Sequence, residues 1–235
     1  MEKSTVDEIR ERFDNDVERF SNLETGQQTM LDSPVCLELI ADAAKLTNPQ
    51  AKSLLDIGCG AGNFTLKLLG KLPGMDCTLI DLSGNMLQRA AERVGEATTG
   101  KVERIQADIR EYEAKENQFD IVVAASVLHH LREDEEWEQV FAGIYRWLKP
   151  GGSFWIFDLV THDSPSIEEL FRQHFGRYLE SLGGENYREK VFAYIAREDS
   201  PRSILYQTDL MKKTGFTNIE LLHKNLCSAA FGGMK

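Results

Sequence analysis

The chain has 235 residues, with 27 basic and 38 acidic side chains and a formal net charge of −11. A chain of this length can bury one large core or two small ones, and its 42% hydrophobic residues exclude an intrinsically disordered protein. The negative charge argues against a protein that coats nucleic acid or an anionic membrane with its whole surface.

Cysteine usage and the start of the chain bear on location and metal binding. The cysteines at positions 36, 59, 77 and 227 form no CxxC pair, so they predict reduced thiols and neither a zinc knuckle nor a disulfide framework. The first residues lack the apolar segment of an export signal, and no run reaches 18 apolar residues. The acidic run 133–136 is interpreted as a helix start, where negative charge is favoured, and not as a metal site. We therefore expect a cytoplasmic protein that binds no metal and does not span a membrane.

Two helices are predicted before the first strand. Residues 3–20 carry apolar side chains at helical spacing, which indicates an amphipathic helix. A second helix is expected over 34–46, with Ser33 as its cap and Pro34 in its first turn.

From residue 53 onward, short apolar runs alternate with longer helical patterns. The predicted strands are 53–57, 77–80, 102–106, 119–124 and 153–157. The predicted helices between them are 64–69, 86–94 and 134–148, and the apolar stripe of the last one indicates core packing. This alternation predicts a parallel, doubly wound sheet with helices on both faces.

The end of the chain departs from this alternation. After helical patterns at 167–181 and 206–214, strand-like runs at 218–222 and 226–231 are separated only by residues 223–225. So short a connection requires an antiparallel hairpin, because parallel neighbours need a long crossover. The predicted fold is α/β: a doubly wound, Rossmann-like, seven-stranded and mostly parallel sheet with an antiparallel C-terminal hairpin.

The strongest local motif is a glycine-rich turn that follows the first predicted strand and opens a helix. Gly58, Gly60 and Gly62 give the pattern GxGxG, with Asn63 where a dinucleotide fingerprint would place its third glycine. Glycines allow a tight turn and let a ligand approach the backbone without a Cβ in the way. The motif favours a ligand here, although a tight turn without a ligand gives the same pattern.

Three aspartates at the ends of successive strands narrow the choice of ligand. Asp81 ends the second strand, where an acid can accept hydrogen bonds from both hydroxyls of a ribose. Asp108 follows the third strand and could accept a bond from an adenine amino group, while Asp56 precedes the glycines and could pair with a cationic amino group. A pyrophosphate would be poorly served by these carboxylates. S-adenosylmethionine, an adenosine with a cationic amino-acid end, fits them.

The sequence resembles the class I S-adenosylmethionine-dependent methyltransferases. The motifs that carry the resemblance are Leu55-Asp56-Ile57-Gly58-Cys59-Gly60-Ala61-Gly62, Asp81, Ala107-Asp108-Ile109, Phe119-Asp120-Ile121-Val122-Val123 and Leu148-Lys149-Pro150-Gly151-Gly152. The resemblance implies methyl transfer with S-adenosyl-L-methionine as the cofactor. The residues it assigns to the cofactor, in addition to Asp56, are Gly58, Cys59 and Gly60 at the methionine part, Asp81, Leu82 and Met86 at the adenosine, Asp108 and Ile109 at the adenine, and Ala125 at the methionine end.

Within this superfamily the nearest likeness is to the group of carboxy-S-adenosylmethionine synthases and tRNA wobble-uridine methyltransferases. In that group an arginine ahead of the last helix binds the extra carboxylate of the cofactor, and an ungapped match places Phe192 at this position. The group's asparagine after the fourth strand is replaced by Ala125. Both departures favour ordinary methyl transfer, with carboxy-S-adenosylmethionine synthesis or tRNA modification as the alternative.

Methyl transfer from a sulfonium is an in-line displacement, so the enzyme mainly positions the acceptor and excludes water. His129 and His130 follow the fourth strand, and Asp158 follows the fifth strand at the same rim of the sheet. We expect His129 and Asp158 to be catalytic and Gln27 and His130 to contact the acceptor, although each is also compatible with a packing or turn role. Nothing after the fourth strand indicates a flipped base. We therefore predict a small-molecule acceptor, no nucleic acid, and a chain that could pair as a homodimer.

The organisation predicted from these motifs is a helical lid over residues 1–50 and a methyltransferase domain over 51–235, in which 160–200 is a helical insertion on the acceptor side. Two other classes stay open. A nicotinamide dehydrogenase has a similar sheet, although Asp56, the GxGxG pattern and the reversed last strand count against it. A non-catalytic nucleoside-binding protein would share the cofactor motifs and transfer no methyl group.

Overall fold

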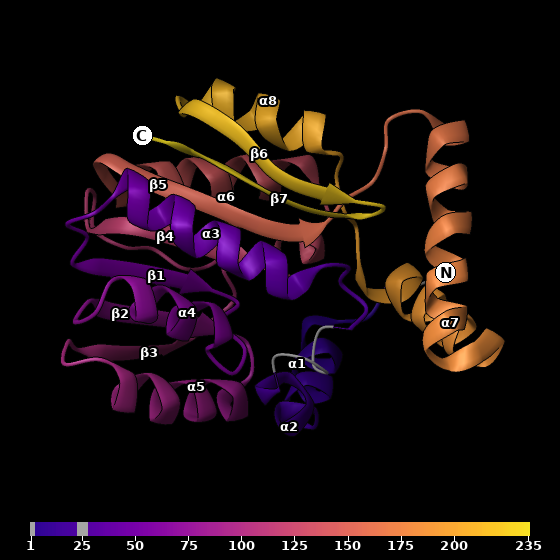
Figure 1. The fold of residues 1–235 in the computed structure, drawn as a ribbon, viewed down its shortest axis with the longest axis horizontal. Coiled ribbons are helices and arrows are strands. Elements are labelled where there is room, and N and C mark those ends of the chain that lie inside the picture. Colours follow the sequence, from indigo (N-terminus) through magenta and orange to yellow (C-terminus); the bar gives the residue numbers. More distant parts are fainter. Residues whose placement is uncertain (1–2, 23–27) are drawn as a thin grey trace.

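A computed structural model describes residues 3–22 and 28–235, and Figure 1 shows a central twisted sheet between helices. Its strands are β1 Ser53–Ile57, β2 Asp76–Asp81, β3 Val102–Gln106, β4 Phe119–Ala125, β5 Leu148–Leu159, β6 Thr217–Asn225 and β7 Ser228–Met234. Its helices are α1 Val6–Asp14, α2 Val17–Ser21, α3 Ser33–Thr47, α4 Asn63–Lys71, α5 Gly84–Ala97, α6 Asp134–Trp147, α7 Pro165–Glu198 and α8 Ile204–Thr214, with a short 3₁₀ turn, η1, at Leu128–His130.

The strand order is β3-β2-β1-β4-β5-β7-β6, and this confirms the predicted sheet. Strands β1 to β5 run parallel, and β7 is antiparallel to both β5 and β6. The order reverses between β1 and β4, and ligands of doubly wound folds bind beyond the strand ends at such a switch point. The topology therefore directs attention to the carboxyl ends of β1, β2 and β4.

The hairpin turn lies later in the chain than predicted. His223, Lys224 and Asn225 belong to β6, and the turn is Leu226-Cys227, because Asn225 pairs with Ser228. A two-residue hairpin turn requires a positive φ, and Leu226 has φ of 48° without being glycine. The turn therefore has none of the residues that normally signal one.

Helices cover both faces of the sheet. Apolar side chains of α3, α4 and α5 pack with one face, and those of α6 and α8 pack with the other. The predicted apolar stripe of α6 is core, with Trp137 0% and Trp147 1% exposed. Helix α3, which we expected to belong to the lid, buries Cys36, Leu37 and Ile40 in the same cluster as β1 and α4. No helix in the described ranges is long and apolar enough to cross a membrane.

The N-terminal region differs in two details from the prediction. The single helix expected over 3–20 is two helices, α1 and α2, separated at Asn15 and Asp16. Helix α3 is preceded by Asp32 in the left-handed conformation, so Ser33 is its first residue and not its cap. The Asp32 carboxylate accepts hydrogen bonds from His223 and Asn225, each at 2.8 Å. This contact ties the hairpin to the start of α3.

The segment 160–200 forms a helix beside the sheet, as the right side of Figure 1 shows. Helix α7 is longer than the predicted 167–181 and bends at Gly183 and Gly184. Gly184 has φ of 76° and ψ of −177°, a conformation open in practice only to glycine. A small apolar cluster joins α7 to Leu31 and to the tip of the hairpin.

Candidate active site

The glycine turn and Asp81 form one backbone arrangement at the carboxyl ends of β1 and β2. Gly58 has φ of 65°, and a Cβ on it would lie 2.6 Å from Val127, so only glycine fits. Asp81 accepts a hydrogen bond from the Gly60 amide at 2.8 Å and, with its other oxygen, from the Ser83 amide at 2.9 Å. Asp81 therefore fixes the turn relative to the start of α5.

A cavity lies between this turn, the start of α5 and the end of β4, and we refer to it as the cofactor cavity. Its lining includes Asp56, Gly58, Cys59, Gly60, Asp81, Leu82, Met86, Ala125 and His130. A narrower adjoining cavity shares Asp81, Leu82 and His130 with it and adds Asp108 and Ile109. The fold thus brings every residue that we expected to bind the cofactor to one edge of the sheet.

Residues of α1 and α2 close the cofactor cavity. Phe13 and Phe20 line it, with ring centroids 5.6 Å apart. The Asn63 side chain donates to the Phe20 carbonyl at 3.0 Å, and the Ser83 hydroxyl donates to Asp14 at 2.5 Å. The cofactor cavity and its narrow neighbour measure only about 90 and 50 Å³, whereas ligand sites typically reach roughly 300–1,000 Å³. A nucleoside-sized ligand therefore requires these side chains to shift.

Burial governs the ionisation of the two carboxyl groups nearest the glycine turn. Asp56 is 1% exposed and accepts a hydrogen bond from the Thr65 hydroxyl at 2.6 Å. Burial raises the pKa of Asp56 to about 7 and that of Asp81 to about 6. A cationic ligand group beside such a carboxyl lowers its pKa again, because the positive charge stabilises the ionised form. The cavity is therefore matched to a ligand that carries positive charge.

Asp108 is paired with a neighbouring arginine. Arg110 donates from its backbone nitrogen at 3.0 Å and from Nε at 2.9 Å to one oxygen of Asp108, and from Nη2 at 2.5 Å to the other. Burial alone would raise the pKa of Asp108, but the hydrogen bonds and charge of Arg110 lower it. Arg110 therefore keeps Asp108 ionised at the rim of the narrow cavity.

A second cavity, of about 330 Å³, lies on the other side of Phe13, Phe20 and Ser126, which line both cavities. We refer to it as the acceptor cavity. Its apolar and aromatic lining includes Met30, Leu159, Phe175, Tyr187, Val191, Tyr194 and Ile195. Its charged lining is Arg12, Asp16, Arg19, Lys190 and Asp199, together with the imidazole of His129. Gln27, which we expected to contact the acceptor, lies outside the described residues.

His129 and Asp158 form a buried pair. The His129 Nδ1 is in close contact with Asp158 Oδ1, and Asp158 also accepts from the backbone amides of Leu128 at 2.8 Å and Leu159 at 2.7 Å. Asp158 is 0% exposed and lines neither cavity, whereas His129 lines the acceptor cavity. We had expected Asp158 to be catalytic itself, but the fold places it behind His129, where its oxygens are occupied by that imidazole and by backbone amides.

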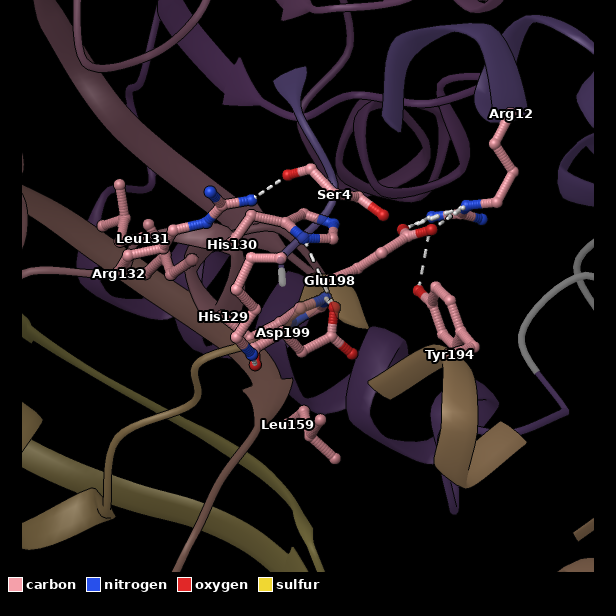
Figure 2. Close-up of polar contacts among 12 residues, drawn as sticks. Ser4, Arg12, His129, His130, Leu131, Arg132, Leu159, Tyr194, Glu198 and Asp199 are labelled. Atoms are coloured by element: carbon pink, nitrogen blue, oxygen red, sulfur yellow. Dashed lines mark hydrogen bonds and ion pairs between the residues drawn. The ribbon is translucent and has the colours of Figure 1, made fainter. Parts of the chain in front are cut away.

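Asp199, which follows α7, faces both histidines, as Figure 2 shows. Burial alone would lower the pKa of His129, but the charges of Asp158 and Asp199 raise it to about 9. For His130 burial and the charge of His129 both act downward, so its pKa lies well below the usual value. Burial raises the pKa of Asp199 to about 6. At neutral pH His129 is therefore a hydrogen-bond donor on the acceptor cavity, and His130 is neutral.

Sequence reasoning did not identify several residues of this region. Arg12 of α1 pairs with Glu198 of α7, with Nε 3.0 Å and Nη2 2.7 Å from Oε2 (Figure 2). Ser126 joins the two cavities and has φ of 55°, unusual for a residue other than glycine. Asp199 is separated from the histidines by about 70 positions, so no local pattern connects them. Of these residues, only Ser126 could have been found from the sequence, because it follows the end of a predicted strand.

The fold and this edge of the sheet define a class of protein. A Rossmann-like sheet with a reversed last strand, a glycine turn after β1 and an acid at the end of β2 together form the class I S-adenosylmethionine-dependent methyltransferase fold. Residues 54–152 match the family described as "Methyltransferase domain". The chain is an S-adenosylmethionine-dependent methyltransferase of class I, with S-adenosyl-L-methionine as its cofactor.

Known proteins resemble this chain over most of its length. It is 27% identical to a demethylmenaquinone methyltransferase of Listeria monocytogenes over 188 residues, 78% of each chain. It is 29% identical to a carboxy-S-adenosyl-L-methionine synthase of Trichodesmium erythraeum over 201 residues, 81% of this chain and 77% of that one. A solved phosphoethanolamine N-methyltransferase of Haemonchus contortus, bound to phosphomonomethylethanolamine and S-adenosylhomocysteine, superposes with a TM-score of 0.55 at 28% identity. That match covers 77% of this chain but only 38% of the Haemonchus chain.

Proposed function

We propose that this methyltransferase transfers the methyl group to a small, largely apolar acceptor held in the acceptor cavity. The observation that carries the proposal is the meeting of the two cavities at Phe13, Phe20 and Ser126. A cofactor on one side of these residues and an acceptor on the other would bring the methyl group and its nucleophile together, away from water. Positioning of this kind can supply on the order of 7–11 kcal/mol of the barrier reduction.

The cofactor-binding roles follow from the lining of the cofactor cavity. In this proposal the glycine turn and Asp56 hold the cationic methionine part, and Asp81 accepts from the ribose hydroxyls. Leu82 and Met86 pack on the adenosine, and Asp108 with Ile109 borders the adenine. Two observations support these roles. The residues line the cofactor cavity or the narrow cavity beside it. Asp56 and Asp81 are buried, and a bound cation favours their ionised form.

The transfer itself balances simply. A lone pair of the acceptor attacks the methyl carbon, the carbon–sulfur bond breaks, and its electron pair stays on sulfur to give S-adenosylhomocysteine. An acceptor that carries a proton releases it to water. We assign to His129 the role of a hydrogen-bond donor that orients the acceptor, and to Asp158 the positioning of that imidazole.

The acceptor class follows from the lining of the acceptor cavity. Its aromatic and aliphatic walls favour an apolar ring or chain, and the relative named demethylmenaquinone methyltransferase fits this chemistry. Nucleic acid is disfavoured by the net charge of −11. We further propose that the protein works in the cytoplasm, and its four free cysteines support this location. Light scattering on the purified chain distinguishes a monomer from a homodimer.

Carboxy-S-adenosylmethionine synthesis is the second candidate, because a synthase is among the relatives. Within residues 3–22 and 28–235, the cofactor cavity is lined by no Arg or Lys. Phe192, at the position of the expected arginine, borders a different hollow, whose lining residues belong to α7. Cations do occur in the acceptor cavity, where Arg12, Arg19 and Lys190 lie. A carboxylate on the transferred carbon would point toward those residues through the same junction of Phe13, Phe20 and Ser126, so the mass of the copurified cofactor decides between the two candidates.

The test is native mass spectrometry of the purified protein, followed by methyl transfer to a panel of apolar phenols, quinols, thiols and amines. We expect S-adenosylmethionine or S-adenosylhomocysteine to copurify and a methylated product to form. Recovery of a carboxylated cofactor would support the second candidate instead. Cofactor binding without transfer to any acceptor class would leave a nucleoside-binding protein and contradict the proposal.

A further inference from the structure

His129, His130 and Asp199 converge where the cofactor cavity and the acceptor cavity meet. The histidines belong to η1, and Asp199 directly follows α7. His130 lines the cofactor cavity, and His129 and Asp199 line the acceptor cavity. Figure 2 shows His130 and Asp199 facing one another beside the Arg12–Glu198 pair.

The distances among the three side chains resemble those of a metal site. Asp199 Oδ1 lies 3.3 Å from His130 Nδ1 and 3.7 Å from His129 Nε2. One ligand atom from each residue falls within 4.8 Å of the others. In a tetrahedral zinc site, bonds of about 2.0–2.2 Å put neighbouring ligand atoms roughly 3.3–3.6 Å apart. Two of the three separations are therefore close to those of bound ligands.

The hydrogen bonding of the same atoms points to a missing partner. Within residues 3–22 and 28–235, neither ring nitrogen of His130 nor Asp199 Oδ1 makes a hydrogen bond of acceptable geometry, although all three atoms are buried. Asp199 is 5% exposed. Buried polar atoms nearly always have a partner, so this group requires an explanation. A cation placed among the three side chains would satisfy Asp199 Oδ1 and one nitrogen of His130.

Asp158 fixes the orientation of the His129 ring. Its Oδ1 contacts His129 Nδ1, and backbone amides hold the carboxylate in place. A carboxylate behind one ring nitrogen fixes the tautomer and directs the other nitrogen, here Nε2, toward a metal. The His129 ring, which lines the acceptor cavity, is thus oriented like a histidine ligand of a metal site.

We propose that His129, His130 and Asp199 bind one divalent metal ion of the zinc type, with an open coordination position toward the acceptor cavity. Three protein ligands and one open position are typical of catalytic zinc sites. The ion would replace the proton on His129 Nε2, since metal ligands bind deprotonated, and the ion would then take over from that N–H the role of orienting the acceptor. Asp158 and Asp199 supply negative charge beside His129, and the charge of Arg12 is offset by its pairing with Glu198.

This site deepens the proposed function and rests on it for the choice of acceptor. An acceptor hydroxyl or thiol that coordinates the ion loses its proton to water more readily, because the cation stabilises the resulting anion. That oxygen or sulfur then attacks the methyl carbon, and the electrons of the carbon–sulfur bond remain on the cofactor sulfur. The inference therefore favours a phenol, enol or thiol as acceptor over a neutral amine.

The test is a titration of the chelator-treated chain of residues 1–235 with Zn²⁺ by calorimetry and with Co²⁺ by visible absorption. We expect one ion per chain, and a cobalt spectrum typical of four- or five-coordination. His130→Ala and Asp199→Asn should each weaken binding at least tenfold. His174→Ala removes an exposed histidine on α7 and should leave binding unchanged.

Two further measurements separate the possible failures. Thermal unfolding of each variant shows whether it folds, and S-adenosylmethionine titration of the metal-free chain shows whether the cofactor site is intact. Cofactor binding with no metal binding overturns the metal site alone, as does metal affinity that both His130→Ala and Asp199→Asn leave unchanged. Loss of zinc binding in His174→Ala would mean surface binding and would also overturn the site. Absence of cofactor binding would contradict the proposed function separately.

Discussion

At the scale of single residues, Asp81 shows how one side chain can serve both structure and binding. Its two oxygens accept from the amides of Gly60 and Ser83, which belong to successive turns at the strand ends. These bonds explain why a carboxylate is retained at a site where burial opposes its charge. Each oxygen keeps a further lone pair that can accept a hydrogen bond, and Asp81 lines the cofactor cavity.

We expect Asp81→Ala to weaken S-adenosylmethionine binding at least tenfold, about 1.4 kcal/mol, because the ribose loses its acceptor and the glycine turn loses its anchor. Isothermal titration measures the change. Asp76→Ala is the matched control, since Asp76 lies at the opposite end of β2 and is exposed. Equal affinity of the Asp81 and Asp76 variants would contradict the ribose assignment.

The ionisation of Asp56 predicts a pH dependence. Its pKa of about 7 in the free protein should fall when the cationic methionine part binds, so binding releases a proton. Affinity should therefore rise as the pH increases from 5 to about 7 and level off above that value. Calorimetry in two buffers of different ionisation enthalpy measures the released proton.

Asp56→Asn is the variant that checks this assignment. It keeps an oxygen that can accept from Thr65 but cannot ionise, so the rise in affinity with pH should become shallower. The residual slope would then come from Asp81, whose pKa of about 6 lies in the same interval. A slope identical to that of the unmodified chain would show that Asp56 does not face the cofactor.

At the scale of elements, the N-terminal segment with α1 is in contact with α7 beside the two cavities. Arg12 pairs with Glu198, and the Ser4 amide donates to the Arg197 carbonyl at 3.0 Å. Phe13 follows Arg12 directly and lines both cavities. We therefore expect the Arg12–Glu198 pair to hold Phe13 in place over the cavities.

Glu198→Gln should loosen α1 while the sheet stays folded. A neutral amide cannot replace the charged, two-point contact with Arg12, and losing one partner of a partly buried pair costs roughly 1–3 kcal/mol. We expect faster hydrogen exchange in residues 5–15 and unchanged exchange in β1 and β4. Glu11→Gln, at an exposed position of α1, is the control. Unchanged exchange in α1 would mean that other contacts hold Phe13 in place.

At the scale of the whole molecule, α3 belongs with the sheet. Leu37 and Ile40 are 2% and 0% exposed and share a core cluster with β1 and α4. Burial of two such side chains contributes roughly 3–6 kcal/mol, a large part of a stability of about 5–15 kcal/mol. We therefore propose that the lid ends before α3 and not at residue 50.

Two truncations test this division. A chain without residues 1–22 should fold cooperatively but bind S-adenosylmethionine more weakly, because Phe13 and Phe20 are gone. A chain without residues 1–50 should fail to fold, because the apolar surface under α3 becomes exposed. Thermal unfolding and cofactor titration measure both. Cooperative unfolding of the chain without residues 1–50 would show that the lid extends to residue 50, as the sequence predicted.

Local patterns in the sequence were sufficient to predict a seven-stranded, mostly parallel sheet with a reversed C-terminal strand, and to predict Asp56, Asp81 and Asp108 at its carboxyl edge. Both depend on local patterns: apolar alternation marks strands, glycines mark the turn, and acids at successive strand ends meet at one edge of a parallel sheet. Leu226 shows where local patterns fail, because a hairpin turn made of residues without turn preference is invisible in sequence.

Only the tertiary structure decided what surrounds the histidines. Asp158 looked like a catalytic residue because it follows a strand, yet packing places it behind His129. Asp199 reaches the same point through the bend of α7 at Gly183 and Gly184, about 70 positions along the chain from His129 and His130. Such contacts depend on how helices pack against a finished sheet, and that information is spread over the whole core.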